Sequence, residues 1–238
     1  MNKTKIEWCD STLNPVVGCS FGCSYCYANK LNSRFKWISD WNQPKFFPER
    51  LEQLNSKQPK NIFMNSMSDI ADWKEEWIIE IAQAIEKNPQ HNYLFLTKRI
   101  EVISRRLDKA TLMLIDRPNV WLGITVTNND DMKARIYELY RLWSLKCKRF
   151  ISFEPIFEKI NIDFLDYFTA IDWIIIGAET GNRKEKIIPK DFWIGHIVYY
   201  AKTRMPVPGP IFMKESMLPV MSENYMLREF PKELIHNV

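Results

Sequence analysis

The sequence predicts an α/β fold, a partial (β/α)6-7 TIM-like barrel formed by a single domain over residues 1–238. Runs rich in β-branched and aromatic residues alternate with segments of helical periodicity, the pattern of strands joined by covering helices. Several runs are continuously apolar, as strands buried on both faces of a parallel sheet are. A complete eight-fold barrel takes about 250 residues, so a chain of 238 residues favours six or seven units. A doubly wound open sheet has the same alternation and remains the alternative.

Seven predicted strands follow one another along the chain. They span residues 12–18, 61–67, 93–99, 120–127, 149–154, 173–179 and 211–215. The predicted helices lie at 28–39, 74–88, 101–108, 130–146 and 189–204, with a short irregular helix within 157–172. In 74–88 the apolar residues Trp77, Ile78, Ile81 and Ile85 recur at helical spacing. Asn128 or Asn129 is the predicted N-cap of 130–146, and Pro189 suits the first turn of 189–204.

The composition predicts a cytoplasmic globular protein. Apolar residues make up 46% of the chain and charged residues 26%, which excludes a disordered or fibrous protein. No apolar run reaches the roughly 18 residues of a membrane span, and the N-terminus lacks the apolar core of a signal peptide. The net charge of +4 permits a nucleic-acid partner without indicating one.

Three of the five cysteines form a motif. Cys19, Cys23 and Cys26 are spaced C-x3-C-x2-C between the first predicted strand and the first predicted helix, whereas Cys9 and Cys147 stand apart. An odd number of cysteines in a reducing compartment argues against a disulfide framework. Three thiolates on one loop suit a [4Fe-4S] cluster, whose usual complement is four. The fourth iron would lack a protein ligand, which is what a chelating cosubstrate needs.

Polar residues end most of the predicted strands. They are Asn65, Ser66, Ser68 and Asp69; Thr97, Lys98 and Arg99; Thr125, Thr127 and Asn128; Ser152 and Glu154; Glu179 and Thr180; and Lys214 and Glu215. Barrels of this type collect their functional groups at the carboxyl ends of the strands. Glu154 lies between Phe153 and Pro155, so its charge requires a partner, and Lys98, Arg99 or a bound ligand can supply one. Asp72 is interpreted as a helix N-cap before Trp73.

The cysteine motif, with Tyr25 before its last cysteine and a β/α chain after it, resembles the radical S-adenosylmethionine (SAM) superfamily. The segment TKIEWCDSTLNPVVGCSFGCSYCYA, with NSMSD, LTKR, SFEP and IIIGAETG downstream, also resembles a compact radical SAM family common in phages and prophages, whose activity is unassigned. The resemblance covers most of the chain. It implies a barrel of the radical SAM type and an enzyme with two cofactors, a [4Fe-4S] cluster and S-adenosyl-L-methionine.

The resemblance also implies roles for the site residues. Cys19, Cys23 and Cys26 would hold the cluster, and an external electron donor would reduce it so that SAM is cleaved to a 5′-deoxyadenosyl radical. Tyr25 would present its backbone to the adenine. The other expected roles are Ser66, Ser68 and Asp69 at the methionine end, Thr125, Thr127 and Asn128 at the ribose, and Lys98, Glu154 and Glu179 toward substrate or radical control. The superfamily's Gly-Gly-Glu is replaced here by residues 66–69, Ser-Met-Ser-Asp, which puts the contact to the SAM amino group in doubt.

Two alternatives stay open. The cysteines, with Cys9 or a histidine, can bind zinc, although zinc sites usually use two separated ligand pairs. The chain can also be a non-catalytic iron–sulfur or zinc module that binds nucleic acid. The basic residues Lys98, Arg99, Arg105, Arg106 and Lys109 suit phosphates, and a solvated helix face explains them equally well. The sequence identifies neither the substrate, for which nucleic acid or a nucleotide is one candidate, nor the oligomeric state.

Overall fold

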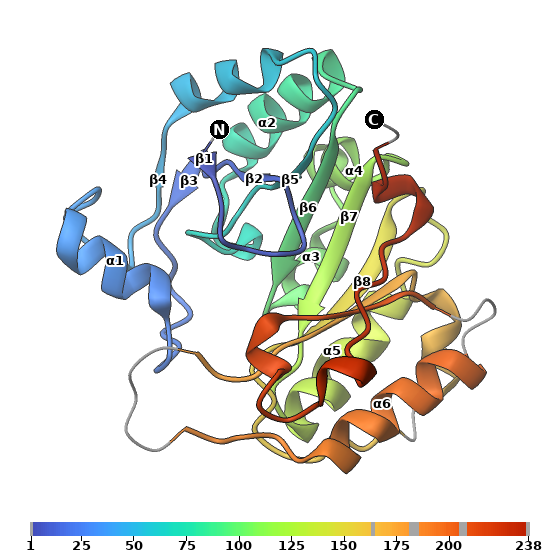
Figure 1. The fold of residues 1–238 in the computed structure, drawn as a ribbon. Helices are drawn as coiled ribbons and strands as arrows, with labels where there is room; N and C mark the ends of the chain where they lie inside the picture. Colours follow the sequence, from blue (N-terminus) through green and yellow to red (C-terminus); the bar gives the residue numbers. More distant parts are fainter. Residues whose placement is uncertain (1, 163–164, 181–185, 205–208, 237–238) are drawn as a thin grey trace. The chain divides into compact units, whose positions relative to one another are not determined.

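A computed structural model of the chain describes residues 2–162, 165–180, 186–204 and 209–236 (Figure 1). Its contacts divide the chain into two compact units. The first comprises Met1–Leu122 with Leu145–Cys147, and the second comprises Gly123–Ser144 with Lys148–Val238. Strand β7 (Val120–Thr125) contributes its first half to one unit and its second half to the other. Each unit is described by itself.

The first unit is built on a mainly parallel sheet with the strand order β1-β2-β5-β6-β7. Its strands before β7 are β1 (Asn2–Lys3), β2 (Ser11–Thr12), β5 (Asn61–Phe63) and β6 (Asn92–Thr97). β1 pairs antiparallel with β2, while β2–β5 and β5–β6 are parallel. Ile62, Tyr93, Leu94 and Phe95 have no exposed surface, so these strands are buried on both faces as their apolar sequences predict.

The helices of the first unit follow its strands. They are α2 (Glu75–Lys87), α3 (Ile100–Arg106) and α4 (Lys109–Ile115), with short 3-10 turns η1 (Pro48–Asn55) and η2 (Ile70–Asp72). The stripe Ile78, Ile81, Ala82 and Ile85 of α2 is buried, and α2 packs against α4. The Asp108 side chain accepts a hydrogen bond from the Thr111 backbone N–H and so caps α4.

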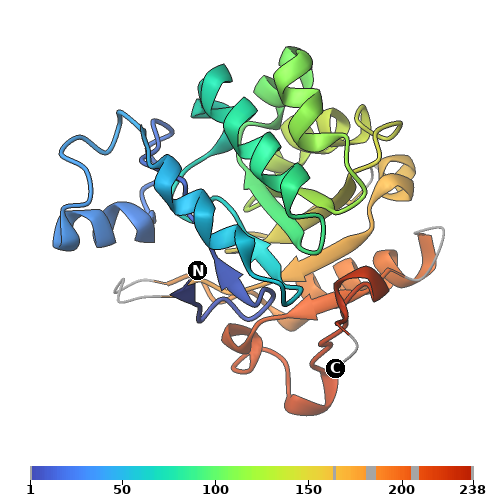
Figure 2. The same cartoon turned by 90° about the horizontal axis from the view of Figure 1, so that it is seen from above.

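A smaller layer of the first unit carries the cysteine segment. It consists of the antiparallel pair β3 (Val16–Val17) and β4 (Lys45–Phe46) with α1 (Tyr27–Phe35). In both ribbon views α1 stands apart from α2 and α4 (Figures 1 and 2). Val17, Ala28, Ile38, Trp41 and Met67 form its buried cluster, against which Cys19 and Cys26 pack. Gly18 has φ +111°, and a side chain on it would lie 2.8 Å from Ile38 and 2.9 Å from the Trp41 carbonyl oxygen.

The second unit continues with the strand order β7-β8-β9-β10. β8 (Lys148–Phe153), β9 (Trp173–Ile176) and β10 (Ile211–Met213) pair in parallel in this order. The remaining elements are α5 (Asn129–Tyr140), α6 (Asp191–Arg204), and the 3-10 turns η3 (Leu165–Ala170), η4 (Glu215–Met217), η5 (Glu223–Tyr225) and η6 (Lys232–Leu234). All four residues of β9 are fully buried, and Phe150 and Phe153 of β8 are buried with them.

The predicted α/β class with parallel strands is confirmed in both units, and several predicted boundaries are wrong. Predicted helix 28–39 ends at Phe35, and predicted helix 189–204 begins at Asp191, so Pro189 lies before it. Predicted strand 12–18 is two strands, β2 and β3, in different sheets. Predicted strand 61–67 ends at Phe63, and predicted helix 130–146 ends at Tyr140. Predicted helix 101–108 is α3, and α4 beyond it was not predicted. Asn128 is the N-cap of α5, as one of the two predicted caps. The predicted region 157–172 contains the 3-10 turn η3, and its residues 163–164 lie outside the described residues.

No helix within the described ranges combines the length and the apolar character that crossing a bilayer requires.

Candidate active site

The three motif cysteines lie on the loop between β3 and α1, as predicted. The Cys19 backbone N–H donates to the Trp41 carbonyl oxygen at 2.8 Å, which ties the start of the loop to the buried cluster. Cys26 is the N-cap of α1, where its Sγ accepts from the Asn29 backbone N–H at 3.3 Å. The side chains of Cys19, Cys23 and Cys26 are all partly buried. The loop is thus fixed at both of its ends.

Lys98, from the end of β6, reaches the middle of this loop. Its Nζ lies 3.2 Å from Cys23 Sγ and 2.9 Å from the Tyr25 hydroxyl, and 4.3 Å from the centre of the Tyr25 ring. Burial by itself lowers the pKa of Lys98, but Tyr25 and Cys23 outweigh it, so the pKa of this ammonium lies above its ordinary value. Lys98 therefore places a positive charge, fixed by its hydrogen bonds, next to the sulfur of Cys23.

Asp69 fixes the backbone from which Lys98 projects. Its carboxylate accepts from the Thr97 hydroxyl at 2.7 Å, the Lys98 backbone N–H at 3.0 Å and the Ala71 backbone N–H at 3.0 Å. Asp69 is buried and caps η2. Asp69 was predicted to contact the methionine end of SAM. In this structure its hydrogen bonds join the turn after β5 to the end of β6, and its contact with SAM stays a prediction.

Asp72 and Arg99 hold the loop beside Cys19. The Asp72 carboxylate accepts from the Ser20 backbone N–H at 2.8 Å and the Ser20 hydroxyl at 2.7 Å, and it pairs with the Arg99 guanidinium at 2.6 Å. Burial raises the pKa of Asp72, but Arg99 and Ser20 lower it by more than burial raises it. The pKa of Asp72 therefore lies below its ordinary value. The predicted role of Asp72 as an N-cap before Trp73 is wrong. Asp72 ends η2, whose N-cap is Asp69, and its side chain is directed to the cysteine loop instead.

The thiol of Cys19 differs from an exposed cysteine in its acidity. Burial raises its pKa to about 12, and the carboxylates of Asp69 and Asp72 add to this effect, although a hydrogen bond to the Phe21 backbone and the charge of Arg99 oppose it. Cys19 is therefore a protonated thiol at neutral pH in this conformation. Because a metal ligand must be a thiolate, binding a metal here would displace this proton.

The donor set fits an iron–sulfur cluster in its chemistry: three thiols lie on one loop, Lys98 contributes a positive charge, and Cys26 stands at a helix N-terminus. Within the part of the chain that the structure describes, however, no three His, Cys, Asp or Glu side chains converge closely enough to hold a metal ion. The loop therefore contains the three cysteines that a cluster needs, but their side chains would have to move closer together to hold one. The cluster and its ligands stay a prediction.

Ser66 and Ser68 have hydrogen bonds inside the protein. The Ser66 hydroxyl exchanges hydrogen bonds with the Asn14 side chain at 3.0 and 3.1 Å, and its carbonyl oxygen accepts from the Tyr27 hydroxyl at 2.8 Å. The Ser68 hydroxyl accepts from the Trp73 indole N–H at 3.1 Å. These bonds fix the segment that follows β5. The predicted contact of Ser66 and Ser68 with SAM stays a prediction.

The predicted ribose-binding residues lie in the second unit, between the end of β7 and the start of α5. Thr127 donates from its hydroxyl to Asp131 at 2.6 Å, and Asn128 caps the helix by accepting from the Asp131 backbone N–H at 2.8 Å. The carbonyl oxygen of Thr125 accepts from Arg135, which also pairs with Asp131. Thr127 and Asn128 are therefore hydrogen-bonded to Asp131, and Thr125 to its partner Arg135. The contact of these three residues with a ribose stays a prediction.

Glu154 and Glu179 also belong to the second unit. Glu154 pairs with Lys214, which follows β10, so the expected pairing with Lys98 or Arg99 is wrong. Gly177 packs against this pair: a side chain there would lie 3.0 Å from Glu154 and 3.1 Å from Lys214. The hydroxyl of Ser152 is buried and has no hydrogen-bond partner among the described residues. Glu179 accepts from the Ile187 backbone N–H at 3.4 Å, and the structure does not bring it to Glu154 by any hydrogen bond between described residues.

We expect Glu154→Gln to lower the free energy of unfolding by about 1–3 kcal/mol, because it leaves a partly buried Lys214 without its counter-charge. Urea denaturation of this variant, of Lys214→Met and of the double variant measures the coupling between the two side chains. A single variant as stable as the wild type would contradict a structural pair. If that variant also lost turnover, Glu154 would instead act on a ligand, as the sequence predicts.

Sequence reasoning missed the partners of the predicted residues. Asn14 is hydrogen-bonded to Ser66, Ser20 to Asp72 and Thr97 to Asp69. Lys214 forms an ion pair with Glu154. Thr97, Arg99 and Lys214 carried a signal, since each is a polar residue at the end of a predicted strand. Asn14 and Ser20 carried none, because their partners lie 52 residues away in the sequence.

The fold and the loop define a class of protein: an α/β chain in which three closely spaced cysteines follow an early strand. Lys98, from the end of a parallel strand, contacts Cys23, while Arg99 and Asp72 bind Ser20 next to Cys19. The chain matches the family described as "Protein of unknown function (DUF5131)" over residues 3–204. It therefore belongs to this family. A search of curated proteins found no match.

A solved structure shares the fold. The crystal structure of SuiB from Streptococcus suis aligns with a TM-score of 0.55 at 12% sequence identity, over 93% of this chain and 54% of SuiB. At this identity the likeness concerns the fold alone. The chain thus corresponds to about half of the length of SuiB.

Proposed function

We propose that this protein is a radical SAM enzyme of the partial-barrel type. In this proposal Cys19, Cys23 and Cys26 hold a [4Fe-4S] cluster, SAM binds its open iron, and an external donor supplies the electron. The observation that carries the proposal is the partly buried ammonium of Lys98 at 3.2 Å from Cys23 Sγ, against a loop that holds three closely spaced cysteines. A lysine held in this way is suited to a site that gathers negative charge, as thiolate-bound clusters do.

The chain's own residues would set the properties of that site. Lys98 donates a hydrogen bond to the Cys23 sulfur, and hydrogen bonds to cluster sulfurs are among the factors that set the reduction potential. Asp69 positions Lys98 by accepting a hydrogen bond from the Lys98 backbone N–H. The Tyr25 hydroxyl accepts a hydrogen bond from the Lys98 ammonium. Arg99 and Asp72 hold Ser20, next to Cys19. These contacts restrain the loop around its centre and its start.

Cys19, Cys23 and Cys26 would hold the cluster, and its chemistry would be to supply one electron for reductive cleavage of the C5′–S bond of SAM to methionine and a 5′-deoxyadenosyl radical. The role of the chain would be to exclude water and to orient the substrate hydrogen toward that radical. Lys98 is the residue proposed for this second task. The substrate is unidentified.

The test is cleavage of SAM by the anaerobically reconstituted protein. With dithionite as the electron donor, the wild type is expected to form 5′-deoxyadenosine and methionine slowly without substrate, as measured by liquid chromatography. Cys23→Ala is expected to form none, while Cys9→Ala serves as the matched cysteine control and retains the activity. If SAM is not cleaved and does not perturb the EPR spectrum of the reduced protein, the non-catalytic nucleic-acid-binding alternative replaces this proposal.

A further inference from the structure

An exposed pair of stacked aromatic rings lies just after the cysteine motif. Phe35, at the end of α1, and Trp37 are 53% and 42% exposed. Their ring centres lie 5.1 Å apart at an interplanar angle of 27°, and the Arg34 guanidinium lies 5.2 Å from the Phe35 ring centre. Single exposed apolar residues are common on protein surfaces. Two that stack on each other beside an arginine form a flat surface that a further ring can extend.

Hydrogen bonds of the neighbouring residues hold this stacked pair in place. Lys36 has a left-handed backbone, φ 54°, and closes α1 through its N–H to the Asn32 carbonyl oxygen at 2.7 Å. The buried Asn32 side chain then binds both backbone groups of Ile38, at 3.0 and 3.1 Å. Ile38 is itself anchored in the buried cluster of this layer. Because the residues on both sides of Trp37 are fixed, little conformational entropy remains to be lost when a ligand binds the rings.

The surface around the stacked pair is basic. Residues 27–45 contain Lys30, Arg34, Lys36 and Lys45, all exposed, and a single acidic residue. That residue is Asp40, whose side chain accepts from the Asn42 backbone N–H at 2.9 Å within its own turn. Aromatic rings surrounded by cations match a ligand that alternates rings with negative charges.

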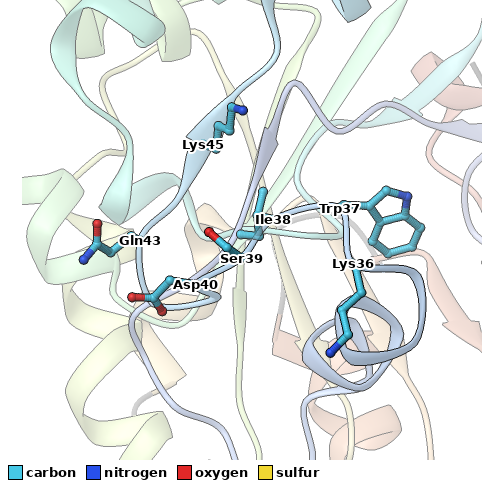
Figure 3. Close-up of a pocket in the computed structure, with 7 residues that line it drawn as sticks. All are labelled: Lys36, Trp37, Ile38, Ser39, Asp40, Gln43 and Lys45. Carbon is cyan, nitrogen blue, oxygen red and sulfur yellow. The ribbon is translucent and has the colours of Figure 1, made fainter.

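A pocket adjoins the rings. Its volume is about 500 Å³, and Lys36, Trp37, Ile38, Ser39, Asp40, Gln43 and Lys45 line it. Figure 3 shows Lys36 and Trp37 at one end of this lining, Asp40 and Gln43 at the other, and Lys45 extending from β4. This volume falls within the range of small-ligand sites, about 300–1,000 Å³. Amide, carboxylate and ammonium groups in a pocket that begins at an aromatic ring are suited to the polar groups of a nucleotide whose base stacks on that ring.

We propose that Phe35, Trp37 and the basic residues around them bind single-stranded nucleic acid, with bases stacked on the rings and phosphates on Arg34, Lys36 and Lys45. A duplex keeps its bases stacked on each other and offers none to the rings. The excess of positive charge disfavours a second copy of the same face, since like charges would then meet. Binding at this surface needs neither the cluster nor SAM, so the proposal does not rest on the proposed function.

The position of this surface links it to the cysteine loop. Trp41, from the same segment, accepts from the Cys19 backbone N–H, and Ile38 packs closely against Gly18. A strand bound to Phe35 and Trp37 would thus lie on the segment that supports the cysteine motif.

The experiment is fluorescence anisotropy with labelled thymidine and uridine oligonucleotides of about 16 nucleotides, the upper site size of one single-strand-binding module. Metal-free and reconstituted wild type are expected to bind them, and to bind a duplex of the same length more weakly. Trp37→Ala should weaken binding by about 5- to 150-fold, the loss that one unstacked base causes. Lys36→Asn keeps a residue that tolerates the left-handed backbone, and should reduce the salt slope by about 0.7. The DNA and RNA arms identify the strand type.

The matched controls are Trp143→Ala and Lys57→Asn, which remove an exposed tryptophan and an exposed lysine elsewhere. Both are expected to bind as the wild type does. Equal losses in the control and test variants, or no binding of either oligonucleotide, would overturn the proposal. So would a dimer of the wild type in sedimentation that Trp37→Ala dissociates, because a second copy would then cover the rings. Each result is independent of whether SAM is cleaved.

Discussion

Alanine at Cys19, Cys23 or Cys26 is expected to abolish the brown colour and the iron content of anaerobically reconstituted protein. The wild type should contain about four irons per chain, the content of one cubane cluster. Each thiolate would hold one iron, so a loop with two thiolates has too few ligands to retain the cluster. Iron analysis and the absorption spectrum of the three variants measure the effect, which should be a loss rather than a weakening.

The controls for this prediction are Cys9→Ala and Cys147→Ala. The Cys9 thiol donates to the Ile6 carbonyl oxygen at 3.8 Å, and Cys147 is 1% exposed, so both belong to local packing. They are expected to retain the wild-type iron content. Stoichiometric zinc without iron in the anaerobically purified wild type would contradict the cluster and favour the zinc alternative.

Asp69→Ala is expected to lower the free energy of unfolding by about 3–5 kcal/mol. The carboxylate is buried and accepts hydrogen bonds from Thr97, Lys98 and Ala71, so its removal leaves three donors without their acceptor. Urea denaturation followed by circular dichroism measures the loss. Thr97→Val removes only one of these donors and should cost about 1 kcal/mol.

The matched control is Asp40→Ala, an exposed aspartate whose side chain makes a local hydrogen bond. Its effect should stay below about 1 kcal/mol. A stable Asp69→Ala variant that no longer binds SAM would show that Asp69 contacts the cosubstrate, as the resemblance implies. The expected result instead assigns Asp69 to positioning Lys98.

The sequence predicted the elements in which local pattern and burial agree. The apolar strands at 93–99, 120–127 and 149–154 and the amphipathic helix at 74–88 all exist, with ends shifted by a few residues. The strand predicted at 12–18 failed at Pro15, which has no N–H for a central ladder and whose carbonyl oxygen instead accepts from Phe47. The predicted strand at 61–67 failed at Asn65. Its side chain binds both backbone groups of Leu96 and takes the place of the ladder.

Helix α4 was missed although the sequence carries its start signal. Leu107 has φ 20°, which ends α3, and Asp108 caps a new helix. An aspartate before a helix-forming segment is a recognisable cap. The backbone break at Leu107 has no such signal, because leucine is not a residue that favours positive φ.

The candidate site was predictable where the residues themselves carry the chemistry. The cysteine spacing and Lys98 at a strand end are visible in the sequence, and the structure brings Lys98 to Cys23. The pairing of Glu154 with Lys214 was not predictable, since 60 residues separate them and Lys98 and Arg99 offered the same charge. Asp72 followed the same logic: a cap is the local interpretation of an aspartate before a helix, and its actual partners, Ser20 and Arg99, are distant in the sequence.

Gly18 has a consequence for how this protein tolerates sequence change. It has no functional group, yet any side chain there would press against Ile38 and the Trp41 carbonyl oxygen, and its positive φ already disfavours every other residue. A substitution would displace the cysteine loop on one side and the segment that holds Phe35 and Trp37 on the other. In a library of single substitutions Gly18 should therefore be as intolerant as a cysteine of the motif, and selection for either surface alone would preserve the other.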